Sequence, residues 1–199
     1  RSRPLFEKEE GLGDFCVITH GPALGGHPGE VAWVHKCGLR LDHKHMHVEH
    51  HGYAFDAVFG PSDGSDAVYR RCASPLVCSA ASGGLGCIIM FGQTGSGKTF
   101  TMRALAPLAA AEIFERKPAD AVVAFGALEI AGSRVSTASG QAVELRDDEA
   151  GNTTPAGLLQ VTVAGPEQLV AEIEGAMTSR RTEATGVHDA SSRSHLLCQ

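Results

Sequence analysis

The feature that most constrains this chain is a glycine-rich segment of eight residues, Gly92-Gln93-Thr94-Gly95-Ser96-Gly97-Lys98-Thr99. It matches the pattern G-x-x-x-x-G-K-[ST]. The apolar run 86–91 precedes it and is typical of a strand buried on both faces of a sheet. Glycines let backbone N–H groups close around phosphate oxygens, and a helix that follows adds further donors. The segment therefore predicts a phosphate-binding loop in which Lys98 reaches the outer phosphates and Thr99 binds Mg²⁺.

Composition narrows the classes of protein that could use such a loop. The chain has 199 residues, of which 43% are hydrophobic and 20% charged, which is typical of one globular domain. Its net charge of -6 argues against a nucleic-acid binder that relies on a basic surface. The apolar runs are far shorter than the roughly 20 residues that span a bilayer, so no membrane segment is expected. Six cysteines without a C-x-x-C pair indicate neither a zinc ribbon nor a disulfide scaffold.

Hydrophobic periodicity predicts alternating strands and helices, and therefore an α/β fold. Besides 86–91, strands are expected at 15–19, 31–35, 54–59, 121–130 and 161–163. Helices are expected at 66–80, 107–116 and 166–180. Pro75 should bend the first of these helices, and Pro107 fits the first turn of the second. Leu169, Ile173 and Met177 form the apolar stripe of the third.

The residues around the loop resemble those of the kinesin motor domain. One segment is similar to that family's P-loop almost letter for letter: Phe91-Gly92-Gln93-Thr94-Gly95-Ser96-Gly97-Lys98-Thr99-Phe100-Thr101-Met102. Four further segments agree in order and spacing: Arg1-Ser2-Arg3-Pro4, Tyr53-Ala54-Phe55-Asp56-Ala57-Val58-Phe59, Ala104-Leu105-Ala106-Pro107 with Ile113-Phe114, and Ser191-Ser192-Arg193-Ser194-His195. The resemblance implies a P-loop NTPase of kinesin type, with a central mixed β-sheet flanked by helices on both faces, here incomplete.

The resemblance also implies a set of site residues, with ATP and Mg²⁺ as cofactors. Arg1, Arg3, Pro4 and Phe100 would lie against adenine. The phosphates would be held by Gly92, Gln93, Thr94, Gly95, Ser96, Gly97, Lys98 and Thr99. Ser191, Ser192 and Arg193 match the core of switch I and are the expected catalytic residues, because short hydroxyls can contact the γ-phosphate and an arginine can hold the loop closed. Thr99 and Ser192 would bind the metal.

The implied function is that of an ATP-dependent motor on microtubules, located in the cytoplasm on the cytoskeleton, without nucleic-acid or membrane partners. Movement and depolymerisation both remain open, since Leu39-Arg40-Leu41-Asp42 is similar to the tip of the internal-motor, depolymerising subfamily. One alternative is a kinesin-like protein that holds nucleotide on microtubules without turnover. His188, Ala131 and the single residue Arg103, where the family has a longer insert, favour it. Another alternative is an unrelated P-loop enzyme, although an N-K-x-D guanine signature is missing.

The resemblance covers the family's pattern from its first strand to switch I, so residues 1–199 are expected to be the N-terminal part of a motor domain. The D-L-A-G-x-E segment of switch II does not occur in them. It supplies the partner of Arg193 and an aspartate beside Mg²⁺. We therefore expect these 199 residues to fold poorly in isolation and not to hydrolyse ATP.

A histidine-rich stretch stands out on this acidic chain. It combines two lysines and an arginine with five histidines: Lys36, Arg40, His43, Lys44, His45, His47, His50 and His51. The stretch predicts a solvated hairpin whose local positive charge could steer binding to acidic tubulin. A metal site is the alternative, because His43, His45 and His47 would share one face of a continuous strand.

Overall fold

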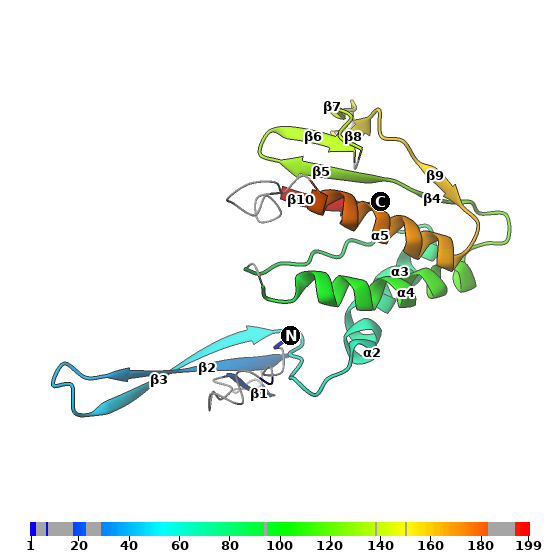
Figure 1. Ribbon diagram of the computed structural model, residues 1–199. Helices are drawn as coiled ribbons and strands as arrows, with labels where there is room; N and C mark the ends of the chain where they lie inside the picture. Colours follow the sequence, from blue (N-terminus) through cyan, green and yellow to red (C-terminus); the bar gives the residue numbers. More distant parts are fainter. Residues whose placement is uncertain are drawn as a thin grey trace. The chain divides into compact units, whose positions relative to one another are not determined.

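The computed structural model describes residues 1–2, 7, 18–22, 29–93, 95–137, 139–149, 151–182 and 194–199. The described parts of the chain form two compact units, within residues 1–71 and 72–199 (Figure 1). Each unit has its own strands and its own buried side chains. Among the described residues, no helix is both long enough and apolar enough to cross a membrane.

The first unit is built around a three-stranded antiparallel sheet with the strand order β1-β2-β3. The strands are β1 (Ile18–Pro22), β2 (Glu30–Leu39) and β3 (Met46–Phe55). β2 and β3 are paired along all ten residues, from Glu30 opposite Phe55 to Leu39 opposite Met46. They form the long hairpin in Figure 1. The strand predicted at 31–35 lies inside β2. The strand predicted at 54–59 is wrong, because β3 begins eight residues earlier and ends where its partner β2 begins.

The tip of the hairpin is a tight turn. Arg40 N donates to His45 O at 2.8 Å, and His43 has a positive φ of 54°. Asp42 caps this turn by accepting hydrogen bonds from the backbone N–H groups of Lys44 and His45, at 3.0 and 3.1 Å. The predicted hairpin is therefore confirmed. The alternative of a three-histidine metal site is wrong, because His43 and His45 lie in the turn and share no strand face with His47.

A helical segment follows the hairpin. It comprises α2 (Ser65–Val68), the π-helical turn η2 (Tyr69–Ala73) and α3 (Ser74–Ala81). The predicted helix 66–80 is confirmed, with an irregularity where Pro75 predicts one. Proline has no N–H to donate within a helix, and the wider π-turn just before it accommodates the missing bond.

The second unit begins with α3 and continues with α4 (Lys98–Arg116), the longest helix described. Its strands are β4 (Val123–Phe125), β5 (Ala127–Ala131), β6 (Arg134–Thr137), β7 (Glu144–Asp147), β8 (Thr153–Ala156), β9 (Val161–Val163) and β10 (Ser194–Cys198), with α5 (Pro166–Thr182) between the last two. They pair as β10-β5-β6, β4-β9 and β7-β8, all antiparallel. The predicted strand 121–130 corresponds to β4 and β5, which are separated at Gly126.

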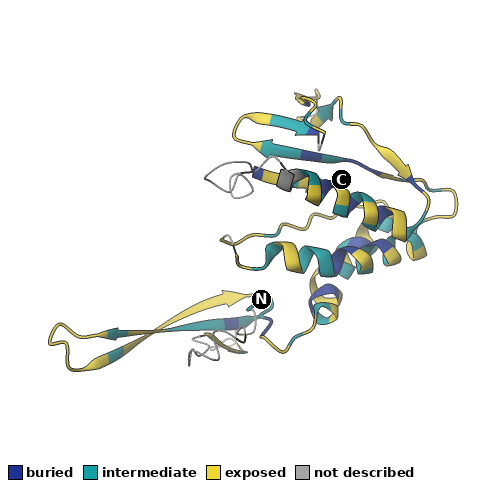
Figure 2. Ribbon diagram, in the orientation of Figure 1, coloured by how far each residue is buried: buried dark blue, intermediate teal, exposed yellow. Residues whose placement is uncertain are grey.

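The core of the second unit lies between α4, α5 and the strands beside them (Figure 2). Its buried members are Ala106, Ala110, Phe125, Val163, Leu169, Ile173 and Ala176. The predicted helix 166–180 and its apolar stripe are confirmed, since Leu169 and Ile173 are buried and Met177 packs against the cluster. Small alanines on α4 let α5 approach closely, which is how the two helices come to lie side by side.

Two predictions next to the glycine-rich segment are wrong. α4 begins at Lys98 rather than at Pro107, so the proline lies inside the helix. The reason is local, because the left-handed conformation of Gly97 (φ 90°, ψ 15°) starts the helix directly after the loop. The run 86–91 forms no strand and is largely exposed. A strand of that kind needs paired neighbours, and no described strand pairs with it.

Candidate phosphate-binding site

The glycines of the candidate site adopt conformations that other residues rarely adopt. Gly92, Gly95 and Gly97 have φ values of 147°, 82° and 90°. A Cβ at Gly92 would also lie 2.5 Å from Ser96 Oγ, so that hydroxyl would have to move to make room for it. The glycines of the pattern are therefore required by the backbone path, as the sequence predicts.

Lys98 lies across this loop. Its Nζ atom donates to the carbonyl oxygens of Gly92 at 2.7 Å and Gln93 at 2.8 Å. Ser96 N donates to Gln93 O at 3.2 Å and tightens the same turn. The ammonium group is thus held over the loop by two carbonyl oxygens. A phosphate oxygen is a stronger partner for an ammonium ion than a carbonyl is.

The first turn of α4 makes the site electropositive. α4 is 19 residues long and is described along its whole length, with no acidic residue in its first turn and no side chain capping its start. Its backbone N–H groups and the positive end of its dipole therefore face the loop, where they favour a bound anion. Thr99 is exposed and lies in the same first turn, so its hydroxyl follows Lys98 directly in the sequence.

A cavity of about 550 Å³ adjoins the first turn and is lined by Thr99, Phe100, Arg103 and Ala104. Phe100 is 67% exposed. Arg103 is held by Glu174 of α5, with Nε and Nη2 at 3.1 and 2.9 Å from Oε2. The cavity thus combines one aromatic face with a fixed cation, a combination that suits a planar, polar group.

The structure brings together only part of the predicted site. The described part of the loop and the start of α4 contain Gly92, Gln93, Gly95, Ser96, Gly97, Lys98, Thr99 and Phe100. Six other residues of the predicted site lie outside the described residues: Arg3, Pro4, Thr94, Ser191, Ser192 and Arg193. Just after them, Ser194 and His195 begin β10, opposite Ala131 and Ile130 of β5. The assignments of Ser191, Ser192 and Arg193 therefore stay predictions.

Arg1, which the resemblance places against adenine, is seen in the first unit with other partners. Its guanidinium donates to Ser65 Oγ and to the carbonyl oxygen of Asp63, both at 3.2 Å. Asp63 Oδ2 in turn accepts from Gly60 N at 2.6 Å. In the first unit Arg1 thus stabilises the turn 60–65, and its contact with a nucleotide stays a prediction.

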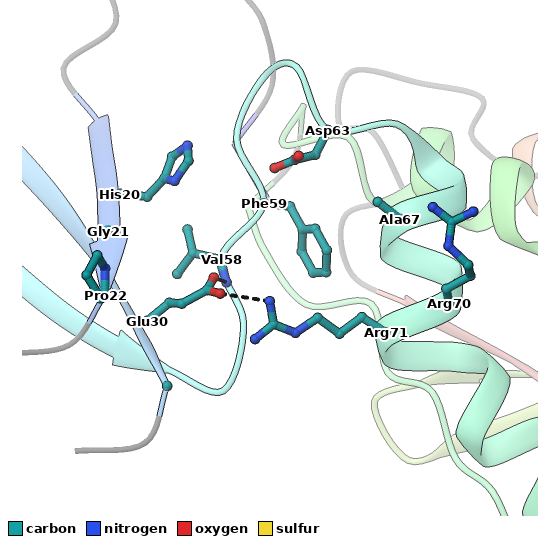
Figure 3. A pocket seen from close by; sticks show the side chains of 11 residues that line it. His20, Gly21, Pro22, Glu30, Val58, Phe59, Asp63, Ala67, Arg70 and Arg71 are labelled. Carbon is teal, nitrogen blue, oxygen red and sulfur yellow. Dashed lines mark hydrogen bonds and ion pairs between the residues drawn. The ribbon is translucent and has the colours of Figure 1, made fainter. Parts of the chain in front are cut away.

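The first unit contains a cavity of its own, of about 810 Å³ (Figure 3). The ion pair between Arg71 Nη1 and Glu30 Oε1, at 2.7 Å, is drawn beside it. The hydrogen bond from Val58 N, and then the bond from Arg71, hold the pKa of Glu30 below its usual range. Sequence reasoning missed this pair, because its two members are 41 residues apart and neither stands in a motif.

The glycine loop, the lysine across it and the helix that starts behind it define a P-loop nucleotide-binding protein. The family comparison is specific about which kind. The model of the kinesin motor domain matches residues 1–199, so the chain belongs to the kinesin motor domain family. The α/β P-loop fold class predicted from the sequence is confirmed, and the alternative of an unrelated P-loop enzyme is excluded.

Known relatives and a solved structure agree with this family. The chain is 31% identical over 206 residues to diatom spindle kinesin-1 of Cylindrotheca fusiformis, a match that covers 100% of this chain and 32% of the relative. It is 33% identical to human kinesin-like protein KIF7 (98% of this chain, 15% of the relative) and 30% identical to Arabidopsis thaliana kinesin-like protein KIN-13B (100% and 29%). The solved structure of a fast kinesin matches the fold with a TM-score of 0.78 at 21% identity, over 100% of this chain and 56% of that chain.

The chain therefore spans about a third or less of these relatives and a little over half of the solved kinesin. The activity, substrates and partners of a whole protein are proposals on this basis. Kinesins as a family are microtubule motors and are generally ATPases.

Proposed function

We propose that this chain binds MgATP through residues 92–99 and, in the full-length protein, couples ATP hydrolysis to movement along microtubules or to their depolymerisation. The observation that best supports this is the position of Lys98, whose Nζ lies 2.7 and 2.8 Å from two carbonyl oxygens of the loop. A triphosphate in the loop would take over the ammonium group from these carbonyls. The start of α4 would contribute its N–H donors on the same side.

The residues at the start of α4 fit the cofactor. Thr99 would hold Mg²⁺ with its hydroxyl, and Ser192 would be a second ligand. The metal would neutralise charge that develops on the β- and γ-phosphates. Ser191 and Ser192 would contact the γ-phosphate and Arg193 would keep switch I closed. Arg1, Arg3, Pro4 and Phe100 would hold adenine, with the Phe100 ring stacking on the base.

The proposed partner is the microtubule, and the proposed location is the microtubule cytoskeleton of the cytoplasm. Membership of a microtubule motor family supports both. Kinesin-like relatives from diatom, animal and plant match the same residues of this chain. Neither the direction of movement nor the choice between transport and depolymerisation follows from these matches.

Replacing Lys98 tests the proposal for nucleotide binding. In Lys98→Ala, we expect the affinity for a fluorescent ATP analogue in Mg²⁺ to fall by at least about tenfold, because a hydrogen bond to a charged group contributes roughly 1.5–3 kcal/mol. Fluorescence titration of the purified full-length protein measures this. Lys117→Ala is the matched control, because Lys117 lies at the other end of α4 and donates to Ala121 O at 3.0 Å.

Lys117→Ala should bind the analogue as the unchanged chain does. Equal affinities in all three proteins would contradict the proposal. The same titration in EDTA should weaken binding to the unchanged chain and to Lys117→Ala, because the metal shares the phosphate charge.

A kinesin-like protein that holds nucleotide without turnover is the second candidate. The exposed run 86–91, which has no strand partner among the described residues, favours it for this chain, since an unbraced loop positions phosphates less well. Phosphate release from ATP by the full-length protein, with and without microtubules, distinguishes the two candidates.

A further inference from the structure

Two histidines face each other across the β2–β3 hairpin, far along the chain from the phosphate-binding loop. His35 and His50 are directly opposed in the antiparallel register. Their Nδ1 atoms lie 2.7 Å apart, and the rings meet edge to face with centroids 4.9 Å apart. At this separation a single proton lies between the two nitrogens, so one ring donates and the other presents a lone pair.

Thr19 of β1 fixes the outer nitrogen of His35. β1 pairs with β2 on the side away from β3, and Thr19 Oγ1 lies 2.7 Å from His35 Nε2. Histidines that bind metals commonly donate their second N–H to such an oxygen, which sets the tautomer and the ring orientation. With Nε2–H donated to Thr19, His35 directs the Nδ1 lone pair at His50.

We propose that His35 and His50 form a site for a divalent transition-metal ion of the kind that prefers imidazole ligands, such as Zn²⁺ or Cu²⁺. The ion takes the place of the proton between the two Nδ1 atoms, and neutral His50 then carries its proton on Nε2. Zn–N bonds of about 2.0–2.1 Å at a tetrahedral angle need nitrogens roughly 3.3 Å apart. The two rings therefore need to separate by only about half an ångström.

The site has open coordination positions. Across the described parts of the chain, no group of three or more His, Cys, Asp or Glu side chains is placed to hold a metal ion. Water must then complete the coordination of an ion at this pair. His50 is exposed and His35 half-buried, so an ion can reach both rings from solution.

The opposite face of the same hairpin supplies a matched comparison. His47 and His51 flank Glu49, each with Nε2 at 3.5 Å from a carboxylate oxygen. Alternation along β3 places His51 on the other face from His50. His51 therefore has the same ring, strand and degree of exposure without an opposed histidine, since its cross-strand partner is Val34.

Trp33 provides a readout next to the pair. It is the one tryptophan of the chain, and it lies two residues from His35 on the same strand face. Its ring covers Gly52, where an added Cβ would lie 2.8 Å from Trp33 Cζ3. Bound Cu²⁺ quenches indole fluorescence at short range, so the tryptophan reports metal at this face of the hairpin.

The test is titration of the full-length protein, without an affinity tag, with Cu²⁺ by tryptophan fluorescence and with Zn²⁺ by calorimetry. His35→Thr and His50→Thr retain strand propensity and should each reduce both signals to the level of the double variant. His51→Thr should leave them unchanged. Thr19→Val should weaken Zn²⁺ binding by about tenfold, because removing the hydrogen-bond partner of a metal-binding histidine usually lowers metal affinity by at least this factor. Mg²⁺ should produce neither signal.

Retained binding in both single variants would overturn the site. So would loss of binding in His51→Thr with His35→Thr unaffected, because the metal would then lie on the other face. Circular dichroism at each step confirms that the strands persist. If the strands are lost in His35→Thr, the titration of His50→Thr tests the site instead. In addition, histidine ¹⁵N spectra of the unchanged protein must show Zn²⁺ bound at Nδ1 rather than at Nε2.

Discussion

Single residues decide how the phosphate-binding loop ends. Gly97 caps α4 in the left-handed region, with φ 90° and ψ 15°, and the first helical bond runs from Thr101 N to Gly97 O. Among the described residues, apart from the chain neighbours of Gly97, no atom lies within 4 Å of the position that its Cβ would take. Only the backbone conformation therefore restricts this position to glycine.

Gly97→Ala tests this restriction. We expect the alanine to destabilise the start of α4 by about 1–2 kcal/mol, the cost of a left-handed conformation for a residue with a Cβ. Amide hydrogen exchange in the first turn of α4 measures the change. Gly175→Ala is the control, because Gly175 lies inside α5 and has open space around its Cβ position. There alanine should slow exchange, stabilising by about 0.5–1 kcal/mol. Equal effects of the two substitutions would refute the argument.

Asp42 controls the tip of the hairpin at the same scale. Its hydrogen bond with His45 Nδ1, at 2.6 Å, lowers the pKa of the Asp42 carboxyl, and bonds from the N–H groups of Lys44 and His45 lower it further. The folded pKa therefore lies below the unfolded one. The stabilisation that Asp42 contributes is present above the unfolded pKa and is lost as the pH falls through the folded pKa.

Carboxyl ¹³C NMR measures this directly. Asp42 should titrate at a lower pH than an aspartate in an unfolded peptide. In His45→Ala its midpoint should move up towards the ordinary value, because the largest cause of the shift is removed. Lys44→Ala is the control, since it keeps the backbone N–H that Asp42 accepts. An unchanged midpoint in His45→Ala would show that the turn backbone alone lowers the pKa.

At the scale of elements, α4 is defined at one end by the glycine loop and along its length by α5. The two helices meet through small side chains, and Ala110 is only 1% exposed. Pro107 lies within α4 without ending it. The packing of α4 against α5 thus stabilises the helix by more than Pro107, a residue that disfavours the helix interior, destabilises it.

Ala110→Leu tests the α4–α5 contact. We expect the larger side chain to destabilise the core by about 1–3 kcal/mol, since it cannot fit without moving α5. Hydrogen exchange of α5 amides should become faster. Ala111→Leu is the control, because Ala111 is the next residue and is exposed. If both variants behave like the unchanged chain, the two helices are not closely packed at Ala110.

At the scale of the whole molecule, the main liability is the apolar run 86–91 together with Leu85. Leu85, Ile89 and Phe91 are 94%, 80% and 98% exposed. No described strand satisfies the backbone groups of this run. An apolar segment with open backbone groups is prone to self-association. We therefore expect the chain to self-associate in isolation, in line with the sequence-based expectation that it folds poorly alone.

Ile89→Ser combined with Phe91→Ser should reduce this self-association markedly, because it removes the two most exposed large apolar side chains of the run 86–91. Static light scattering against concentration measures it. Leu41→Ser is the control, because Leu41 is fully exposed but lies in the hairpin tip, outside this run. An equal reduction of self-association by both changes would mean that exposed apolar area in general, rather than this segment, causes association.

The sequence by itself determined the family, the phosphate-binding loop and the helices 66–80 and 166–180. Each of these depends on residues that are close in the chain, such as the glycines at 92, 95 and 97 or the stripe from Leu169 to Met177. Such patterns report backbone conformation and helical period directly, so they can be recognised without knowing what the segment contacts.

Only the tertiary structure decided the length of the β2–β3 hairpin, the pairing of His35 with His50 and whether the run 86–91 forms a strand. Strands are stabilised by partners that are often distant in the sequence, so the same apolar run is a buried strand beside neighbours and an exposed segment without them. The histidine spacing predicts His43, His45 and His47 together, yet the turn at 40–45 and the register across it select a different pair. Register depends on long-range pairing, which local patterns do not contain.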